Sequence, residues 1–462
     1  MQKIDFIKNT RDRLNKIGPG MCAMKWLHQT LYLHTGDNHS CYHPRPHHIP
    51  LHEIKDDPSA LHNTSWKKQQ RKTMLEGGRP EECYYCWNIE DLGGDHISDR
   101  MIHSSSDFAV NEIEYLGELP WDAPINPRYL EVSFGNGCNY RCGYCCPQAS
   151  TLWMDEIKKH GNYDLTYNQY GIEFLKSGNY YGPKDDNPYI EAFWKWWPSL
   201  KKDLHTLRIT GGEPLMNPGA MQFFDLLENE PAPQLEITIN SNLGVTFDKV
   251  DRMYDRVESL LNQKKIRSFS MHTSIEGWGE QAEYMRTGLK CDHWERNLKE
   301  GLRRGFKIGI MCTFNVLCVA TYRNFLEQMI VWRKELAETS TKQHALHQLQ
   351  FDVPYLKEPP HWMLNILPKE FLEPHMDANL QFIADNKEWF TDVEYEKMRR
   401  VKDYAFQNPV DAGKIRNGQR DFYVFFTEND KRLGTNLLET FPMYKDFYEY
   451  CKGVYNEAPA KG

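Results

Sequence analysis

The chain has 462 residues, of which 40% are hydrophobic and 13% aromatic, enough for two or three domains with substantial cores. A net charge of -8 does not favour nucleic acid as a partner, and no apolar run is long enough to span a bilayer. The N-terminus lacks the apolar core of a secretory signal, and twelve cysteines in an unsecreted chain favour metal binding over disulfides, so we expect a cytoplasmic metal-binding protein.

The first 100 residues contain two pairs of cysteines. Cys22 precedes a predicted strand over 26–34, and a predicted turn at 36–38 leads to Cys41. Because a hairpin brings its two ends together, Cys22 and Cys41 are expected to face one site.

The second pair follows a predicted helix over 65–76, with Ser65 as its expected N-cap and glycines as its stop. This pair is Cys83 and Cys86, and with the first it provides four thiolates, enough to occupy every iron of one 4Fe–4S cube. Four thiolates also suit zinc, and nearby histidines keep zinc as an alternative: His39, His43, His47 and His48. We expect the histidines to be loop residues.

A connector is expected over 101–126, then an α/β region over 127–354 and a mainly helical, aromatic-rich region over 355–462. The predicted strands are 130–134, 206–210, 235–240, 268–275, 307–314 and 347–353, and the helical patterns between them include 247–262, 293–304 and 322–337. Repeated strand and helix units predict a parallel sheet with right-handed crossovers. The long stretch from 148 to 204 predicts an insertion over the mouth of the site.

The loop after the first of these strands contains Cys138, Cys142 and Cys145 in the spacing C-x3-C-x2-C. A complete set of cluster ligands numbers four, so three thiolates on one loop leave one iron open to a ligand from outside the protein. Zinc is the alternative, but zinc sites usually pair two hairpins at longer spacing. Cys146 follows directly, and because adjacent side chains in a tight loop are expected to point apart, we do not expect it to be a fourth ligand.

This loop resembles that of the radical S-adenosylmethionine (SAM) superfamily. The resemblance implies a partial (β/α)6 barrel, a 4Fe–4S cluster on Cys138, Cys142 and Cys145, and SAM bound to the open iron through its amino and carboxylate groups. An electron, from a donor such as flavodoxin or ferredoxin, would cleave SAM to a 5′-deoxyadenosyl radical that abstracts hydrogen from the substrate. The protein would position the reactants and exclude water.

Two later motifs resemble cofactor-binding segments of this family. The first is Gly211-Gly212-Glu213-Pro214, which resembles the motif for the methionine ammonium group. Glycines let the backbone come close, while a carboxylate and carbonyls accept hydrogen bonds from the ammonium. The second is Asn240-Ser241-Asn242, whose short polar side chains suit ribose hydroxyls or the carboxylate of SAM.

The end of the fourth strand resembles the family's Ser-x-Asp-Gly segment, with Glu276 where Asp is commoner. By that match Ser274 would contact the ribose or the carboxylate, and Arg286 would clamp the methionine carboxylate through a forked contact. Tyr144 is a candidate for packing on the adenine, and Asn315 is a further cofactor candidate. Alternatively, these residues have only structural roles, as capping hydroxyls, as part of a surface ion pair or in the packing of the loop.

The segment Cys22-x13-Gly36-x4-Cys41 resembles the opening of SPASM and twitch modules, which carry auxiliary clusters in radical enzymes acting mainly on peptides and proteins. The resemblance implies a second 4Fe–4S cluster on Cys22, Cys41, Cys83 and Cys86, in a twitch-like module over residues 1–100. In most relatives this module follows the barrel, whereas here it precedes the barrel. The whole arrangement resembles twitch-domain radical proteins encoded by phages, whose location would be the host cytoplasm.

Cys312 and Cys318 lie in or beside predicted barrel elements. Buried thiols are mostly inert packing residues. An enzyme that returns a hydrogen atom to a substrate radical needs a donor, however, so both cysteines are candidate hydrogen donors. In the C-terminal region, helices such as 368–389 are expected to cover the open side of the barrel, and the aromatic run 422–426 to form core.

Together these features predict a radical SAM enzyme that modifies a peptide or protein post-translationally. One alternative keeps the radical chemistry but acts on a small molecule or a nucleotide. Another is a non-catalytic scaffold that binds zinc or an iron–sulfur cluster. The reaction that follows hydrogen abstraction is open.

Overall fold

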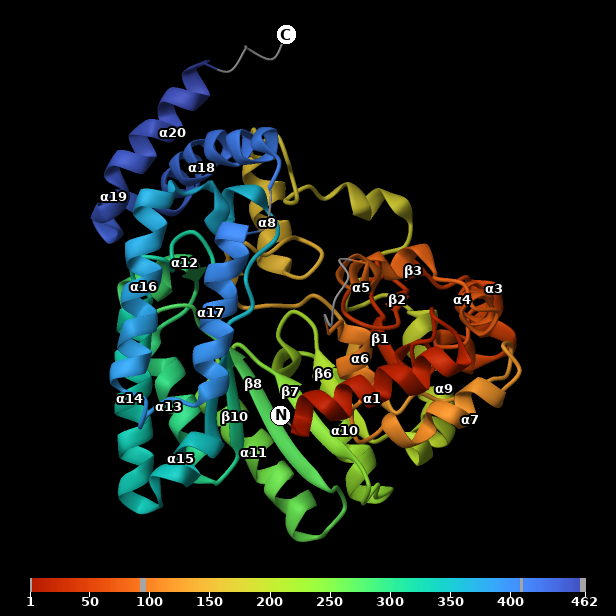
Figure 1. The fold of residues 1–462 in the computed structure, drawn as a ribbon. Coiled ribbons are helices and arrows are strands. Elements are labelled where there is room, and N and C mark those ends of the chain that lie inside the picture. The colour runs from red at the N-terminus through yellow and green to blue at the C-terminus, as the bar shows by residue number, and fades with distance from the viewer. Residues whose placement is uncertain (1, 92–96, 408–409, 458–462) are drawn as a thin grey trace. The chain divides into compact units, whose positions relative to one another are not determined.

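The computed structural model describes residues 2–91, 97–407 and 410–457. The chain is an α/β protein with mostly parallel strand pairing and many helices, as the sequence pattern predicts (Figure 1). It folds into two compact units, unit 1 (1–135, 175–239 and 257–269) and unit 2 (136–174, 240–256 and 270–462). None of the described helices is long and apolar enough to cross a membrane.

Unit 1 contains a sheet with the strand order β7–β6–β4–β1–β2–β3. Its strands are β1 (His28–Tyr32), β2 (Asp37–His39), β3 (His47–His48), β4 (Tyr129–Ser133), β6 (Thr206–Thr210) and β7 (Glu236–Asn240). β4, β6 and β7 run parallel, with Val132 opposite Ile209 and Leu207 opposite Ile237. These four side chains are buried, so the sheet is held by its apolar core, and the first three predicted strands of the α/β region are confirmed.

The N-terminal segment adds a strand to this sheet. β1 pairs in parallel with β4, with Leu31 opposite Val132, and it follows the short helix α2 (Met24–Leu27). The segment predicted as a module of its own therefore shares a sheet with the first predicted barrel strand. Because parallel strands end at one edge, the chain leaves β1 beside the end of β4, where the N–H of Leu33 donates to the carbonyl of Ser133 at 2.9 Å.

The predicted N-terminal hairpin forms with a shifted turn. β1 and β2 are antiparallel, and the chain reverses over 33–36 rather than 36–38. Gly36 has a φ of 69°, which suits glycine, and its N–H donates to the carbonyl of Tyr32 at 2.8 Å. Asp37, predicted as a turn residue, is instead the first residue of β2.

Helix α4 (Ser65–Leu75) forms where the sequence predicts it. The predicted N-cap is wrong by one position. Thr64 is the cap, because its Oγ1 accepts a hydrogen bond from the N–H of Lys67 at 3.1 Å, and Ser65 is the first helical residue.

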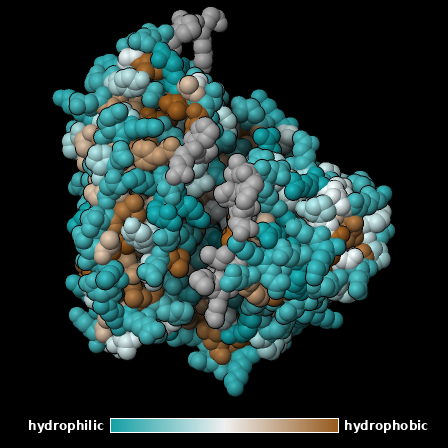
Figure 2. Space-filling view, in the orientation of Figure 1, coloured by the Kyte–Doolittle hydropathy of each residue, from teal (hydrophilic) through white to brown (hydrophobic). Residues whose placement is uncertain are grey.

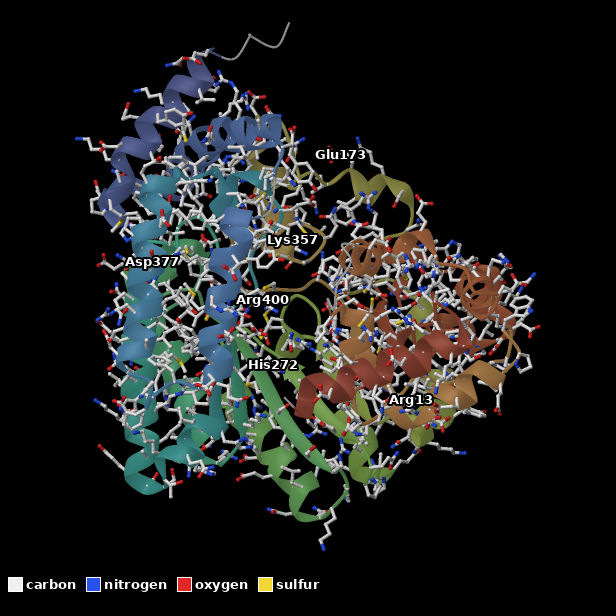
Figure 3. All side chains as sticks on the ribbon, viewed as in Figure 1. Arg13, Glu173, His272, Lys357, Asp377 and Arg400 are labelled. Atoms are coloured by element: carbon white, nitrogen blue, oxygen red, sulfur yellow. The ribbon has the colours of Figure 1, made fainter. Side chains whose placement is uncertain are left out.

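The predicted connector contains short helices. α6 (Asp99–Ser104) and α7 (Ile113–Glu118) lie in or beside it, and α7 contacts the first helix, α1 (Gln2–Ile17). Arg13 of α1, labelled in Figure 3, donates through Nε to Glu114 of α7 at 2.7 Å. The connector is thus folded against the N-terminal helix.

Unit 2 contains the parallel strands β8 (Ser268–Ser274, from Ser270 on in this unit), β10 (Lys307–Met311) and β11 (Leu349–Asp352). Ile310 of β10 lies opposite Thr273 on one side and Phe351 on the other, and all three are buried. The helices predicted near these strands form as α11 (Phe247–Asn262, up to Arg256 in this unit), α13 (Cys291–Arg303) and α14 (Tyr322–Thr339). All six predicted strands exist, and their closure into a partial barrel stays a prediction.

The C-terminal region is mainly helical, as predicted. Its longer helices are α16 (Lys369–Asp385), α17 (Asp392–Gln407), α18 (Ala412–Leu433) and α20 (Lys445–Glu457). Phe422, Phe425 and Phe426 of α18 are fully buried, so this aromatic run is core. Asp377 of α16, labelled in Figure 3, pairs with Lys402 of α17. On the face in Figure 2, hydrophobic residues are scattered in small groups among hydrophilic ones.

Candidate active site

The cysteine loop lies in unit 2 and contains the short strand β5 (Arg141–Cys142). β5 pairs antiparallel with β9 (Arg286–Thr287), which places Cys142 opposite Arg286. Cys138, Cys142 and Cys145 are partly exposed free thiols. The fold therefore brings two segments that the sequence identifies, the cysteine trio and the downstream arginine, to one place.

N–H groups point at the sulfurs of this loop. Nη1 of Arg286 lies 3.3 Å from Sγ of Cys142, and Nδ2 of Asn242 lies 3.6 Å from Sγ of Cys138. Burial raises the pKa of Cys142, and the Arg286 charge opposes that rise. Cations and N–H donors beside a thiol favour the thiolate, which is the form that binds iron. These residues therefore fit a thiolate-bound cluster.

Arg286 is the centre of a buried polar group with Glu276 and Tyr144. Its Nε donates to Oε2 of Glu276 at 2.6 Å, and its Nη2 donates to Oε1 of Glu276 and, at 2.6 Å, to the Tyr144 oxygen. The Tyr144 hydroxyl donates to Oε1 of Glu276 at 2.6 Å. Glu276 is fully buried and Arg286 is 5% exposed.

The charge of Arg286 is compensated locally. Burial lowers the pKa of its guanidinium, but Cys142 and Glu276 raise that pKa more, so the group stays protonated. The fork that we expected on the SAM carboxylate here holds a carboxylate of the protein. Cofactor contacts by Arg286, Glu276 and Tyr144 therefore stay predictions. Of the guanidinium nitrogens, Nη1 is the one that faces Sγ of Cys142 in the cysteine loop.

Neighbouring segments fix the backbone of the loop. Nε2 of Gln169 donates to the carbonyl of Tyr144 at 2.9 Å, and the Tyr170 hydroxyl donates to the carbonyl of Gly143 at 2.8 Å. A Cβ on Gly143 would lie 2.1 Å from Cζ2 of Trp362, so only glycine fits against this buried indole.

Cys145 and Cys146 interact, contrary to our expectation that adjacent side chains point apart. Sγ of Cys145 lies 3.8 Å from the carbonyl oxygen of Cys146, and the neighbouring thiols raise the pKa of Cys145 and lower that of Cys146. The loop turns so tightly after Cys142 that consecutive side chains stay within reach, with the N–H of Cys145 donating to the carbonyl of Cys142 at 3.0 Å.

The segment after β7 contacts the loop through one of its three predicted residues. Asn242 donates through Nδ2 to Oδ1 of Asn139 at 2.9 Å, besides facing Cys138. Ser241 accepts from the N–H of Leu243 at 3.0 Å, which supports a residue with a φ of 52°. Asn240 ends β7. Ser241 thus has a structural use, and cofactor contacts by all three stay predictions.

The segment Gly211–Pro214 lies in unit 1, after β6. Gly211 has a φ of 140°, and a Cβ there would lie 2.8 Å from the carbonyl oxygen of Gly135. Glu213 is 1% exposed and accepts from the N–H of Leu215 at 3.0 Å. Glycine at position 211 therefore lets this backbone lie close to Gly135, in the segment that leads into the cysteine loop. A role of Gly211–Pro214 in SAM binding stays a prediction.

Three other candidates are buried in unit 2. Asn315 is fully buried and accepts from the N–H of Leu317 at 3.0 Å. Cys312 and Cys318 are fully buried, and burial raises the pKa of both thiols well above the usual value. Such thiols stay protonated, as a hydrogen donor requires, and donation stays a prediction. Ser274 ends β8 opposite Met311.

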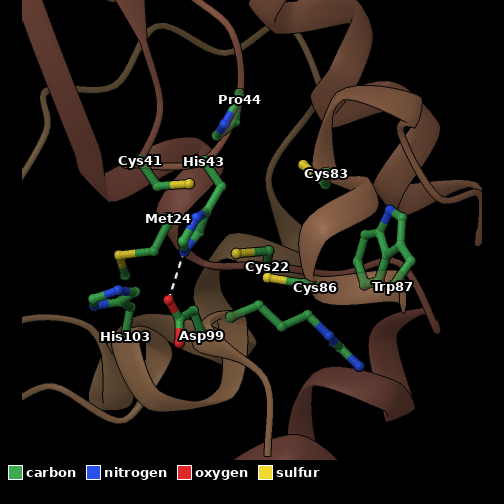
Figure 4. Close-up of a pocket in the computed structure, with 11 residues that line it drawn as sticks. Cys22, Met24, Cys41, His43, Pro44, Cys83, Cys86, Trp87, Asp99 and His103 are labelled. Carbon is green, nitrogen blue, oxygen red and sulfur yellow. Dashed lines mark hydrogen bonds and ion pairs between the residues drawn. The ribbon is translucent and has the colours of Figure 1, made fainter. Parts of the chain in front are cut away.

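The four N-terminal cysteines line one cavity in unit 1 (Figure 4). Cys22, Cys41, Cys83 and Cys86 reach it from three separate segments, as the hairpin and helix pattern predicts. The atom-free space measures about 370 Å³, part of it open to solvent. Burial raises the pKa of Cys83 to about 11, with the Lys25 charge opposing the rise. The convergence of four thiols beside a cation fits a thiolate-bound metal group.

The wall of this cavity includes His43, one of the histidines named for the zinc alternative, but its Nε2 lies 2.5 Å from Oδ2 of Asp99. The wall also includes residues that the sequence did not single out. Arg100 lines it too, and a buried ammonium, Lys25, interacts electrostatically with Cys83 and Cys41. The sequence feature that could have pointed to Lys25 is its position three residues after Cys22. Among the described residues, no three His, Cys, Asp or Glu side chains are grouped closely enough for one metal ion.

Comparison with known proteins gives one family match. A model of the radical SAM superfamily matches residues 132–320, which include the cysteine trio, Gly211–Pro214, Glu276 and Arg286. A GTP 3′,8-cyclase from Helicobacter pylori is 21% identical over 294 residues, covering 64% of this chain and 74% of that protein.

Two solved structures show a weak likeness. One is native anSMEcpe with bound AdoMet and a Kp18Cys peptide, with 13% identity, a TM-score of 0.31 and coverage of 55% of this chain and 61% of that chain. The other is SuiB from Streptococcus suis, with 13% identity, a TM-score of 0.33 and coverage of 71% and 59%. The chain thus spans about three fifths of each solved chain.

Proposed function

Because this chain is a radical SAM enzyme, matched to that superfamily over residues 132–320, we propose that it abstracts hydrogen from a peptide or protein and so modifies it post-translationally. The observation that carries the substrate class is the convergence of Cys22, Cys41, Cys83 and Cys86 on one cavity. This arrangement supports a second 4Fe–4S cluster, and the twitch and SPASM modules that the segment resembles occur in radical enzymes acting mainly on peptides and proteins.

The first cluster is assigned to Cys138, Cys142 and Cys145. When bound, this cluster and SAM supply a nucleoside radical that takes a hydrogen atom from the substrate. Asn242 and Arg286 donate to the sulfurs and so stabilise the thiolates. We assign the cofactor contacts to the segments that resemble those of the family, which are Tyr144, Gly211, Gly212, Glu213, Pro214, Asn240, Ser241, Asn242, Ser274, Glu276, Arg286 and Asn315.

Three further assignments belong to this proposal. Cys312 and Cys318 are hydrogen-donor candidates, because a buried thiol keeps its proton. A one-electron donor of the flavodoxin or ferredoxin class reduces the cluster. The site of action is the cytoplasm.

Deuterium transfer tests the substrate class. The reconstituted protein is incubated without oxygen with dithionite, SAM and a pool of fully deuterated peptides. Hydrogen abstraction from a peptide carbon is expected to give deuterated 5′-deoxyadenosine, which mass spectrometry detects. Unlabelled product from the deuterated pool, together with labelled product from deuterated ribonucleotides, would overturn the peptide assignment.

Replacing Cys83 with serine tests the second cluster. The variant is expected to lose about half of the bound iron, because one of two cubes loses a ligand, while 5′-deoxyadenosine formation without substrate persists. Iron, zinc and sulfide are measured after anaerobic reconstitution. Cys451→Ser, a buried thiol in α20, is the matched control and should keep its iron. Unchanged iron in the Cys83 variant, or zinc in the wild-type protein, would contradict the assignment.

A nucleotide substrate is the second candidate. The similarity to a GTP 3′,8-cyclase favours it, at 21% identity over 64% of the chain. The deuterated ribonucleotide arm of the transfer experiment decides between the two, because only the true substrate class passes its label to 5′-deoxyadenosine.

A further inference from the structure

One part of the predicted insertion, residues 163–170, contacts the backbone of the cysteine loop inside unit 2. We call this segment the brace. Nε2 of Gln169 donates to two consecutive carbonyls of the loop, to that of Tyr144 at 2.9 Å and to that of Cys145 at 3.2 Å. A single amide group thus holds the backbone on both sides of the last cysteine of the trio.

These contacts fix the direction of one expected cluster ligand. The carbonyl of Tyr144 belongs to the peptide group before Cys145, and the carbonyl of Cys145 belongs to the peptide group after it. Because peptide groups are planar, holding both planes fixes the two backbone dihedral angles between them and so the direction of the Cys145 side chain. The Tyr170 hydroxyl also holds the preceding peptide group, since it donates to the carbonyl of Gly143 at 2.8 Å.

Helix α18 anchors the brace and the loop. Asp421 of α18 is fully buried, and its Oδ2 accepts from the N–H of Thr166 at 2.9 Å and from Oγ1 of Thr166 at 2.6 Å. Oδ1 of Asn429, two turns further along, accepts from Nη2 of Arg141 in β5 at 3.0 Å. α18 lies outside residues 132–320, so the C-terminal region supports the cysteine loop from beyond the superfamily match.

We propose that Gln169 is a positioning residue that sets the affinity of this site for SAM by holding Cys145. The inference rests on the proposed assignment of the SAM cluster to Cys138, Cys142 and Cys145. Groups that orient metal ligands without touching the metal change metal affinity or activity by about 10- to 100-fold when they are lost. Gln169 is partly buried, so its replacement leaves the core of the unit intact.

Two variants of Gln169 test the proposal. Gln169→Leu removes the donor at similar size, and Gln169→Glu places a carboxylate against the two carbonyls. Both are expected to raise the KM for SAM about tenfold in substrate-free 5′-deoxyadenosine formation, while bound iron stays near the wild-type value. A mere loss of folded protein would lower iron and kcat together and leave KM unchanged, so the two constants separate positioning from stability.

Gln348→Leu is the matched control. Gln348 ends α15 (Lys342–Gln348) in the same unit, and its Nε2 also donates to two backbone carbonyls, those of Leu302 at 2.6 Å and Phe306 at 3.3 Å. The control therefore loses the same kind and number of hydrogen bonds, at carbonyls that do not belong to the cysteine loop. Its KM for SAM should equal that of the wild type.

Hydrogen exchange in the metal-free protein gives a second readout that needs no cofactor. In Gln169→Leu the backbone amides of residues 142–146 are expected to exchange about tenfold faster than in the wild type, because two peptide planes of the loop lose their partner. In Gln348→Leu the exchange of the same amides should stay at the wild-type rate.

A raised KM for SAM together with faster exchange in the loop supports the inference. An unchanged KM in both Gln169 variants, or an equal rise in Gln348→Leu, overturns it while leaving the SAM cluster in place. Full SAM cleavage by Cys145→Ala would overturn the assignment of the trio itself, and the inference with it.

Discussion

Replacing Cys142 with alanine is expected to reduce 5′-deoxyadenosine formation to the level of a protein-free control. Cys142 is the central member of the trio and lies opposite Arg286 in the β5–β9 pair. Two thiolates cannot hold a cube in which the protein supplies three ligands and SAM completes the set. The measurement is 5′-deoxyadenosine by mass spectrometry after anaerobic reduction with dithionite, together with bound iron.

Cys451→Ala is the control for loss of a thiol in the same unit. Cys451 is fully buried in α20, so the variant tests whether a cavity alone lowers activity. It should keep both its iron and its SAM cleavage. If the Cys142 variant cleaved SAM at the wild-type rate, the assignment of the trio to the SAM cluster would be wrong.

The strands of the α/β region could be predicted because each combines local alternation or apolar runs with turn residues at its ends. The strand predicted at 206–210 is β6, and the helix predicted at 247–262 is α11. The shifted turn after β1 could not be predicted in detail. The turn formers Gly36, Asp37 and Asn38 favour a reversal over 36–38, but strand pairing places Asp37 and Asn38 in β2, so the chain reverses earlier.

Long-range pairing explains what the sequence missed. Nothing local in 1–100 indicates that β1 would add in parallel to β4, a partner about 100 residues away. The cysteine pairs could be found, because their spacing carries the ligand chemistry. Arg100 could not, because only the fold brings it to the cavity that these thiols line. Likewise, Glu276 and Arg286 were each identified, but not as partners of one another.

Glu276→Gln is expected to destabilise the protein by about 3–5 kcal/mol, because it leaves the Arg286 charge buried without its partner. Glu276 is fully buried, and both of its carboxylate oxygens accept from Arg286. The measurement is the free energy of unfolding from chemical denaturation of the metal-free protein. Glu396→Gln is the matched control. That carboxylate pairs with Arg399 at the surface, both side chains being 54% exposed, so its loss should leave the stability close to that of the wild type.

The double variant Glu276→Gln/Arg286→Met separates the charge from the packing. It removes the uncompensated guanidinium, so part of the lost stability should return even though two polar contacts are gone. SAM cleavage should be lower in the double variant than in the wild type. The reason is that Nη1 of Arg286, which lies 3.3 Å from Sγ of Cys142, is lost with the side chain. A Glu276→Gln protein as stable as wild type would mean that solvent reaches Arg286.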